Sequence, residues 1–146
     1  MAISSGSNLD RDALAASIFA ILDEVYDQSP WSQKQIVDDL SQDNTDYFFL
    51  SDGDRVIAFL SVQDLFGELE ITNIAVLKAY QGQGLAKQLL LQLASVSQPI
   101  FLEVRASNIR ARQLYQSFGF EAVGQRKNYY HHPVEDAIIM KREGQA

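Results

Sequence analysis

The 146-residue sequence predicts a single α+β domain built on a mixed sheet, covering residues 1–146. Apolar residues recur at helical spacing in some segments and alternate as in strands in others. The segments come in the order helix, helix, three strands, helix, strand, helix and two strands. That order combines hairpins with crossover helices, which is typical of an α+β or mixed-sheet fold. With 47% hydrophobic and 21% charged residues, the composition is that of an ordinary soluble globular protein.

Local signals place the elements of the first half. Asp10 is a suitable N-cap for a helix with apolar residues from Leu14 to Val25, and Ser32 can cap a second helix ending near Leu40. The turn signal Asp52-Gly53-Asp54 joins two predicted strands. Residues 1–8, before the first helix, are expected to be poorly ordered. The three strands are predicted at 47–50, 55–62 and 69–77.

The second half predicts two crossover helices and three further strands. One helix begins after Gly84 and continues until Pro99 ends it. Another is capped by Ser107 and ends at Gly119, a natural C′ residue. Tyr129 to Pro133 is expected to be the loop between the last two strands. The three further strands are predicted at 100–105, from 120 onward, and at 137–140.

Charge and composition exclude several classes of function. The chain has no cysteine, which excludes disulfides, a thiol nucleophile and Cys-ligated metal. The net charge of −7 disfavours nucleic-acid binding and would attract a basic partner, although it can equally serve solubility alone. No apolar run is long enough to span a membrane and no secretory signal is visible, so a cytoplasmic location is expected.

A glycine-rich turn, Gln81-Gly82-Gln83-Gly84, directly follows a predicted strand and opens a helix. Glycines allow close approach of a ligand to the backbone, and a helix start presents unpaired N–H groups and the positive end of the dipole. These features favour a pyrophosphate site. The spacing is neither a P-loop nor a Rossmann fingerprint. A tight turn without a ligand is the alternative.

Two groups of residues resemble a known family. The stretch from Ile74 through Gln81-x-x-Gly84-x-Ala86 resembles the acetyl-CoA motif of the GNAT superfamily. The segments Pro30-Trp31-Ser32, Leu102-Glu103-Val104-Arg105-Ala106-Ser107-Asn108, Leu114-Tyr115 and Asn128-Tyr129-Tyr130 are similar to the RimI-type ribosomal-protein-alanine N-acetyltransferases, and this similarity covers about residues 30–141. It implies the GNAT fold, with a central sheet of six or seven strands, splayed in the middle and flanked by about four helices.

The resemblance also implies where acetyl-CoA binds. The loop amides would hold its diphosphate, and the preceding strand would pair with its pantetheine. Two positions depart from the commoner pattern: Gly82, where a basic residue is frequent, and Ala86, where glycine is frequent. The residues assigned to the diphosphate are Gly82, Gln83, Gly84, Leu85, Ala86 and Lys87, and those facing the pantetheine and acetyl group are Ile74, Ala75 and Val76.

Glu103 is the candidate general base. Strand alternation places it on one face with Phe101 and Arg105, away from Leu102 and Val104. A partly desolvated carboxylate has a raised pKa, which suits a base for an α-amine whose own pKa is about 7.7–8. From the residue pattern alone, a cross-strand ion pair with Arg105 or another basic residue is the alternative. The resemblance assigns Glu103 the role of base, acting through water.

Further roles follow from the same resemblance. Tyr115, which could otherwise be a core tyrosine, would protonate the departing CoA thiolate, and Asn108, otherwise a first-turn helix residue, would contact CoA. Tyr129 and Tyr130 would hold the first residues of the substrate. His131 and His132 are expected to be exposed loop residues, because neighbouring histidines rarely share a ligand sphere and no third ligand is evident. No metal is expected.

The sequence therefore predicts an acetyl-CoA-dependent N-acetyltransferase. By resemblance, the substrate is the N-terminal alanine of a small-subunit ribosomal protein, and attack is direct within a ternary complex. One alternative is a GNAT enzyme for another protein N-terminus, a lysine or a small-molecule amine. A second is a non-catalytic acyl-CoA-binding, ribosome-associated factor. We expect a monomer or weak dimer that contacts neither nucleic acid nor membrane.

Overall fold

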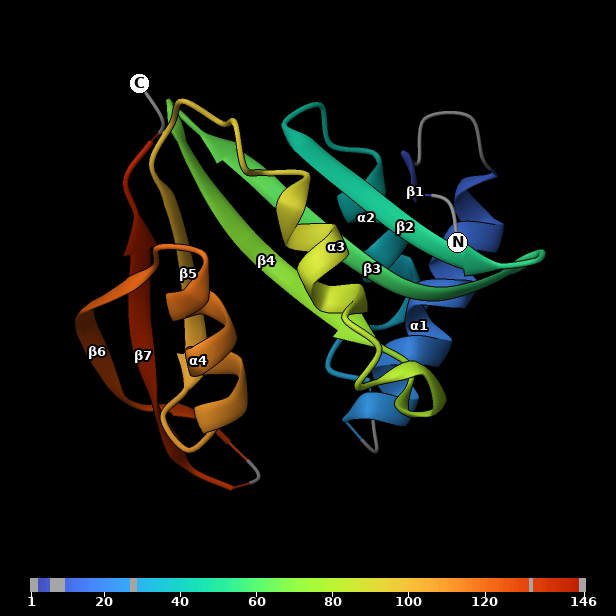
Figure 1. Ribbon diagram of the computed structural model, residues 1–146. Coiled ribbons are helices and arrows are strands. Elements are labelled where there is room, and N and C mark those ends of the chain that lie inside the picture. Colours follow the sequence, from blue (N-terminus) through green and yellow to red (C-terminus); the bar gives the residue numbers. More distant parts are fainter. Residues whose placement is uncertain (1–2, 6–9, 27–28, 132, 145–146) are drawn as a thin grey trace. The chain divides into compact units, whose positions relative to one another are not determined.

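The computed structural model describes residues 3–5, 10–26, 29–131 and 133–144, and these form seven strands, four α-helices and a short 3₁₀ helix (Figure 1). The chain divides into two compact units, Met1–Gln63 with Thr72–Leu93, and Asp64–Ile71 with Ala94–Ala146. Strand β4 (Glu68–Val76) supplies residues to both units. Antiparallel and parallel strand pairs occur together, which confirms the predicted α+β class with a mixed sheet. None of the helices among these residues is long and apolar enough to cross a membrane.

The first unit contains strands in the order β1-β2-β3-β4. Residues 57–62 of β3 are all buried, which requires cover on both faces of the strand. Figure 1 shows that cover, with α1 and α2 on one face and α3 on the other. The elements of this unit are β1 (Ile3–Ser5), α1 (Arg11–Val25), α2 (Gln33–Leu40), β2 (Thr45–Asp52), β3 (Arg55–Leu65), η2 (Lys78–Tyr80) and α3 (Leu85–Leu91).

The predicted caps of the first two helices are confirmed. The side chain of Asp10 accepts a hydrogen bond from the N–H of Asp12, and Ser32 forms a capping box with Gln35. Two expectations were wrong. Residues 3–5 are not loose, because they pair as β1 with β2. Helix α3 ends at Leu91 rather than near Pro99, since the serine-rich residues after it favour turns over helix.

The second unit contains strands in the order β4-β5-β7-β6. β4 pairs in parallel with β5 (Ile100–Arg105), and β7 (Glu135–Arg142) pairs antiparallel with both β5 and β6 (Glu121–Tyr130). Alternate residues of β5 are buried, as predicted, and α4 (Ile109–Ser117) buries Tyr115. The core of this unit is formed by Ile71, Ile100, Leu102, Val104, Tyr115, Phe120, Ala137 and Met140.

The C′ glycine predicted for α4 is confirmed, and the predicted N-cap is wrong. Its N-cap is Asn108, not Ser107, and the Asn108 side chain accepts a hydrogen bond from the N–H of Ala111. At the other end Gly119 has φ +89°, and the N–H groups of Gly119 and Phe120 bond the carbonyls of Gln116 and Tyr115. This is the Schellman arrangement expected of a C′ glycine.

The loop between the last two strands is shorter than predicted. Strand β6 continues to Tyr130, so Tyr129 and Tyr130 end a strand instead of lying in a loop. The turn begins at His131, and His132 lies outside the described residues. The pairing of β6 with β7 is irregular between Arg126 and Tyr130, and Asn128 has φ +53°. A sequence pattern with period two does not reveal such a bulge.

Candidate active site

The glycine turn of the first unit has the geometry of a ligand-binding loop. Gly82 and Gly84 have φ of +83° and +78°, a conformation that side chains with a Cβ rarely adopt. An added Cβ at either glycine would meet no heavy atom within 4 Å, so the space beside the backbone is open. Gly84 is the N-cap of α3 and has no side-chain hydrogen bond to the first turn. The amides of that turn are thus available to an anion such as a diphosphate.

Two side chains fix the turn in place. The phenol of Tyr80 donates to Asp52 at 2.6 Å, and this bond raises the pKa of Tyr80. The amide of Gln81 donates to the carbonyl of Val76 at 2.9 Å, which ties the turn to the end of β4. The Gln81 side chain therefore links the glycine turn to the end of β4.

The other residues predicted to contact acetyl-CoA are placed as follows. On β4, Ile74 and Val76 are half-buried and Ala75 is buried, as strand alternation requires. Gln83 and Lys87 are exposed, while Ala86 is half-buried and Leu85 is buried beneath the turn. Lys87 lies in the first turn of α3, three residues after Gly84.

Glu103 lies on the half-buried face of β5 in the second unit. Arg126 Nε donates to Glu103 Oε1 at 3.1 Å, and the side chain of Glu103 is 20% exposed. Its second oxygen, Oε2, is buried and has no hydrogen-bond partner among the described residues. The ion pair foreseen from the residue pattern thus exists, with Arg126 as the partner instead of Arg105. It holds one carboxylate oxygen and leaves the other as an acceptor.

A pocket opens beside Glu103, and three charged residues that the sequence did not assign to the site line it: Glu68 and Glu70 on β4 and Arg126 on β6. Burial raises the pKa of Glu70, the nearby carboxylate of Glu103 raises it further, and Arg126 partly offsets both effects. The alternation of glutamates in β4 was visible in the sequence, but its register with β5 was not. The pocket is lined by Leu65, Glu68, Leu69, Glu70, Phe101, Leu102, Glu103, Arg126 and Ile139.

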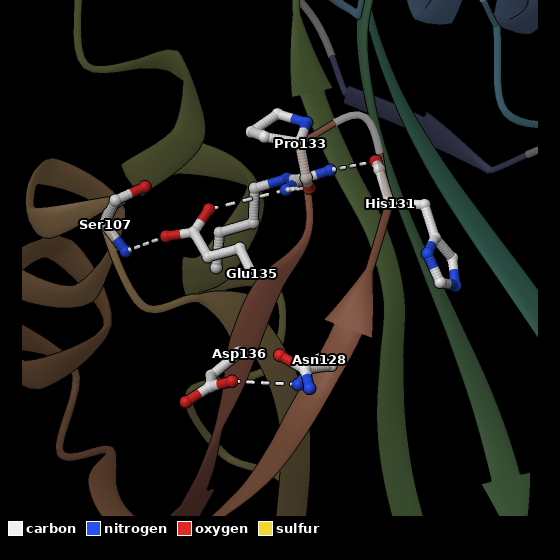
Figure 2. Close-up of polar contacts among 7 residues, drawn as sticks. Ser107, Asn128, His131, Pro133, Glu135 and Asp136 are labelled. Carbon is white, nitrogen blue, oxygen red and sulfur yellow. Dashed lines mark hydrogen bonds and ion pairs between the residues drawn. The ribbon is translucent and has the colours of Figure 1, made fainter.

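Tyr129 projects from the bulge in β6, next to this pocket. Partial burial and the neighbouring Glu103 carboxylate raise its pKa, so the phenol remains protonated at neutral pH. The guanidinium of Arg126 lies 5.7 Å from the centre of its ring. Asp136 holds the bulge by accepting a hydrogen bond from the N–H of Asn128 at 2.8 Å (Figure 2). It also accepts one from the side-chain amide of Gln125 at 3.1 Å.

A second cluster holds the turn between β6 and β7. The carboxylate of Glu135 accepts from the N–H of Ser107 at 2.5 Å and pairs with Arg105 at 3.4 Å (Figure 2). Arg105 also donates to the carbonyls of His131 and Pro133, each at 3.1 Å. Its guanidinium lies 4.5 Å from the centre of the Tyr130 ring. One arginine therefore fixes both the turn and Tyr130.

The remaining predicted residues have clear structural surroundings. Tyr115 is 7% exposed, and its ring meets Phe120 edge-on with centroids 5.9 Å apart. The side-chain oxygen of Asn108 caps α4, so its amide nitrogen is the group left for a ligand. Among the residues described, no three His, Cys, Asp or Glu side chains gather as metal ligands would.

Comparison with known proteins defines the family. Residues 15–120 match the model of the acetyltransferase (GNAT) family. The chain is 40% identical over 121 residues to [ribosomal protein bS18]-alanine N-acetyltransferase of Haemophilus ducreyi, covering 76% of this chain and 81% of that protein. It is 38% identical over 120 residues to the enzyme of that name from Escherichia coli K12, covering 76% and 79% of the two chains. The crystal structure of the ribosomal-protein-S18-alanine N-acetyltransferase from Escherichia coli superposes with a TM-score of 0.85 at 34% identity, over 99% of this chain and 95% of the other.

The mixed sheet, the glycine turn and these similarities define the class of protein, an acetyltransferase that uses acetyl-CoA as its cosubstrate. The chain belongs to the GNAT acetyltransferase family. Family membership confirms three predictions made from the sequence: the fold, the enzymatic class and the acetyl donor.

Proposed function

We propose that this protein is an N-alpha-acetyltransferase that acetylates the N-terminal alanine of the small-subunit ribosomal protein bS18. The similarity to two bacterial enzymes of that name, at 40% and 38% identity over three quarters of the chain, is the observation that carries the proposal. The net charge of −7 supports a basic substrate such as a ribosomal protein, because opposite charges accelerate encounter. In this proposal residues 1–146 act as one catalytic domain, monomeric or weakly dimeric, in the cytoplasm.

Glu103 is proposed as the general base. The α-ammonium of the substrate must lose a proton before its nitrogen can attack the thioester carbonyl. The buried Oε2 of Glu103 is a free acceptor for that proton, directly or through a water molecule. Arg126 keeps the carboxylate oriented by holding Oε1. Attack is direct, because the chain has no cysteine to carry an acyl group and no serine–histidine pair at motif spacing.

Tyr115 is proposed as the general acid. When the new amide bond forms and the carbon–sulfur bond breaks, its phenol would give a proton to the departing thiolate. The pKa of a phenol, about 10, is only slightly above that of a thiol, about 8.5, so the proton transfer from Tyr115 to the thiolate is only slightly unfavourable. Packing against Phe120 fixes the ring of Tyr115 in one orientation.

The first unit is proposed to bind the acetyl donor. The residues from Gly82 to Lys87 hold the diphosphate, since the two positive-φ glycines expose their amides on an open side. Ile74, Ala75 and Val76 pair with the pantetheine, and backbone N–H groups near Val76 polarise the thioester carbonyl. Asn108 contributes its side-chain amide to the same ligand.

Tyr129 and Tyr130 are proposed to hold the first residues of the substrate. Both rings are positioned by arginines, Arg126 for Tyr129 and Arg105 for Tyr130. The two rings also meet edge-to-face, with centroids 5.1 Å apart. Because these contacts already order both rings, the tyrosine side chains lose little conformational entropy when a peptide binds.

Intact-mass spectrometry of peptides incubated with the protein and acetyl-CoA tests the proposal. One peptide carries the N-terminal sequence of bS18, and a matched peptide is blocked at its α-amine but contains a free lysine. We expect acetylation of the first peptide alone. Acetylation of the lysine peptide would instead identify a GNAT enzyme for another amine. Binding of acetyl-CoA without turnover of any amine would identify a non-catalytic acyl-CoA-binding protein.

A further inference from the structure

Two carboxylates from neighbouring strands share one face of the sheet in the second unit. In the parallel register of β4 and β5, Glu70 is opposite Phe101, and Glu103 follows Phe101 by two residues. Directly paired residues of adjacent strands point to the same face, as do residues two apart in a strand. Glu70 and Glu103 therefore project from the same face, and both line the pocket described above.

The charges in this pocket are not balanced. Three carboxylates, those of Glu68, Glu70 and Glu103, line it with one guanidinium, that of Arg126. Arg126 is engaged with Glu103 Oε1. Lys141 on β7 lies 5.3 Å from the ring of Phe101, but its ammonium pairs with Glu143. Two negative charges thus remain in the pocket without a cation.

The hydrogen bonds are incomplete at the same place. Within the described part of the chain, no ion pair or hydrogen bond reaches the carboxylate of Glu70, and Glu103 Oε2 is buried without a partner. Burial and the proximity of Glu103 raise the pKa of Glu70, as expected of a half-buried carboxylate that has no cation of its own. A small cation with several N–H donors would supply the hydrogen bonds that both carboxylates lack.

We propose that Glu70 is a specificity-determining residue that binds the protonated α-amine of the substrate together with Glu103 Oε2. This inference rests on the proposed function, which supplies a primary ammonium as the substrate. An ammonium has three N–H donors, enough to reach both carboxylates. Phe101 and Ile139, which lie on the same face as Glu103, give the pocket an apolar wall that suits a short aliphatic side chain. After transfer, the acetylated nitrogen is neutral and has one N–H, so the product loses this interaction and is released.

Binding measurements that separate the amine from the rest of the peptide test this role. Calorimetric titration in the presence of CoA compares an alanine-initiated peptide that has a free α-amine with the same peptide N-acetylated. The wild-type protein is expected to prefer the free amine. Glu70→Gln should weaken binding of the free-amine peptide by about tenfold, as expected for the loss of one charge-assisted interaction. Its affinity for the acetylated peptide should not change.

Two further variants control for folding and for general charge effects. Glu70→Asp retains the carboxylate and should retain the preference for the free amine. Glu121→Gln removes the same charge from an exposed position on β6 and should change neither affinity. An equal loss of affinity for both peptides in Glu70→Gln would indicate a structural role and overturn the proposal. Unchanged affinity for both would overturn it as well.

Turnover distinguishes this inference from the proposed function. If the wild type acetylates the alanine peptide and Glu70→Gln keeps its amine preference, the inference fails while the function stands. If no peptide is acetylated but a preference for the free amine still depends on Glu70, the proposed function fails and the ammonium site stands. If the wild type neither acetylates the peptide nor prefers its free amine, both are wrong.

Discussion

Arg105 is predicted to control the order of the turn that directly follows Tyr129 and Tyr130, the residues proposed to hold the peptide. The replacement Arg105→Ala removes the hydrogen bonds to the carbonyls of His131 and Pro133, the ion pair with Glu135 and the contact with the Tyr130 ring. The Arg105 side chain is 29% exposed, so each interaction is partly screened. The two charge-assisted hydrogen bonds contribute roughly 1 kcal/mol each at such a site, and the ring contact roughly 0.5 kcal/mol. Because the freed carbonyls regain water, the expected loss of unfolding free energy is about 2 kcal/mol.

Denaturant unfolding and steady-state kinetics measure the two consequences. A looser turn must be ordered again when the peptide binds, so KM for the peptide should rise about fivefold, equivalent to roughly 1 kcal/mol. KM for acetyl-CoA should change little, because none of the residues proposed to bind it contacts the Arg105 side chain, and the hydrogen bond from Asn108 N–H goes to the Arg105 carbonyl, which the variant keeps. Arg110→Ala is the matched control, since Arg110 is an exposed residue of α4. Arg105→Ala with wild-type stability and wild-type KM for the peptide would refute the reasoning.

Three other changes give independent tests. Glu103→Gln should lower kcat by roughly 10²- to 10⁴-fold, as expected for loss of a general base, while acetyl-CoA still binds; wild-type turnover at pH 7 would exclude Glu103 as the base. Gly84→Ala forces a Cβ into a left-handed conformation at a cost of roughly 1–2 kcal/mol, so the Kd for acetyl-CoA, measured by titration, should rise about tenfold or the protein should be less stable. Hydrogen bonds from Ser107, and also Arg105, hold the pKa of Glu135 below its usual 4.5, so its carboxylate stabilises the fold above that pH and this contribution is lost as the pH falls through the lower folded-state pKa. Glu135→Gln should therefore lower Tm at pH 7 and reduce the loss of Tm on acidification; an unchanged Tm profile would contradict this assignment.

Local features of the sequence were sufficient to predict most elements of secondary structure. The caps of α1 and α2 and the C′ glycine of α4 depend on hydrogen bonds between residues two to five apart, so a short window of sequence contains them. Strand alternation placed Glu103 on the half-buried face of β5 for a similar reason. The cap at Asn108 was missed because Ser107 and Asn108 are both good N-cap residues, and only the backbone geometry chooses between them.

Other features depended on contacts between residues distant in the sequence. Glu103 pairs with Arg126, 23 positions away, while Arg105 pairs with Glu135, 30 positions away. The strand that contains Tyr129 and Tyr130 extends further than its pattern predicted, because Asp136 of the next strand stabilises a bulge at Asn128. Glu70 became part of the pocket through the parallel register of β4 and β5.

The sequence by itself determined the fold class, the N-caps of α1 and α2, the C′ glycine of α4 and the glycine turn, because each depends on the periodicity and hydrogen bonding of neighbouring residues. Only the tertiary structure decided which charges meet in the pocket. Strand register sets those distances, and a shift of one residue would move every side chain of the strand to the opposite face. The sequence thus supplied the carboxylates, and the pairing of strands determined that Glu70 and Glu103 line one pocket with Arg126.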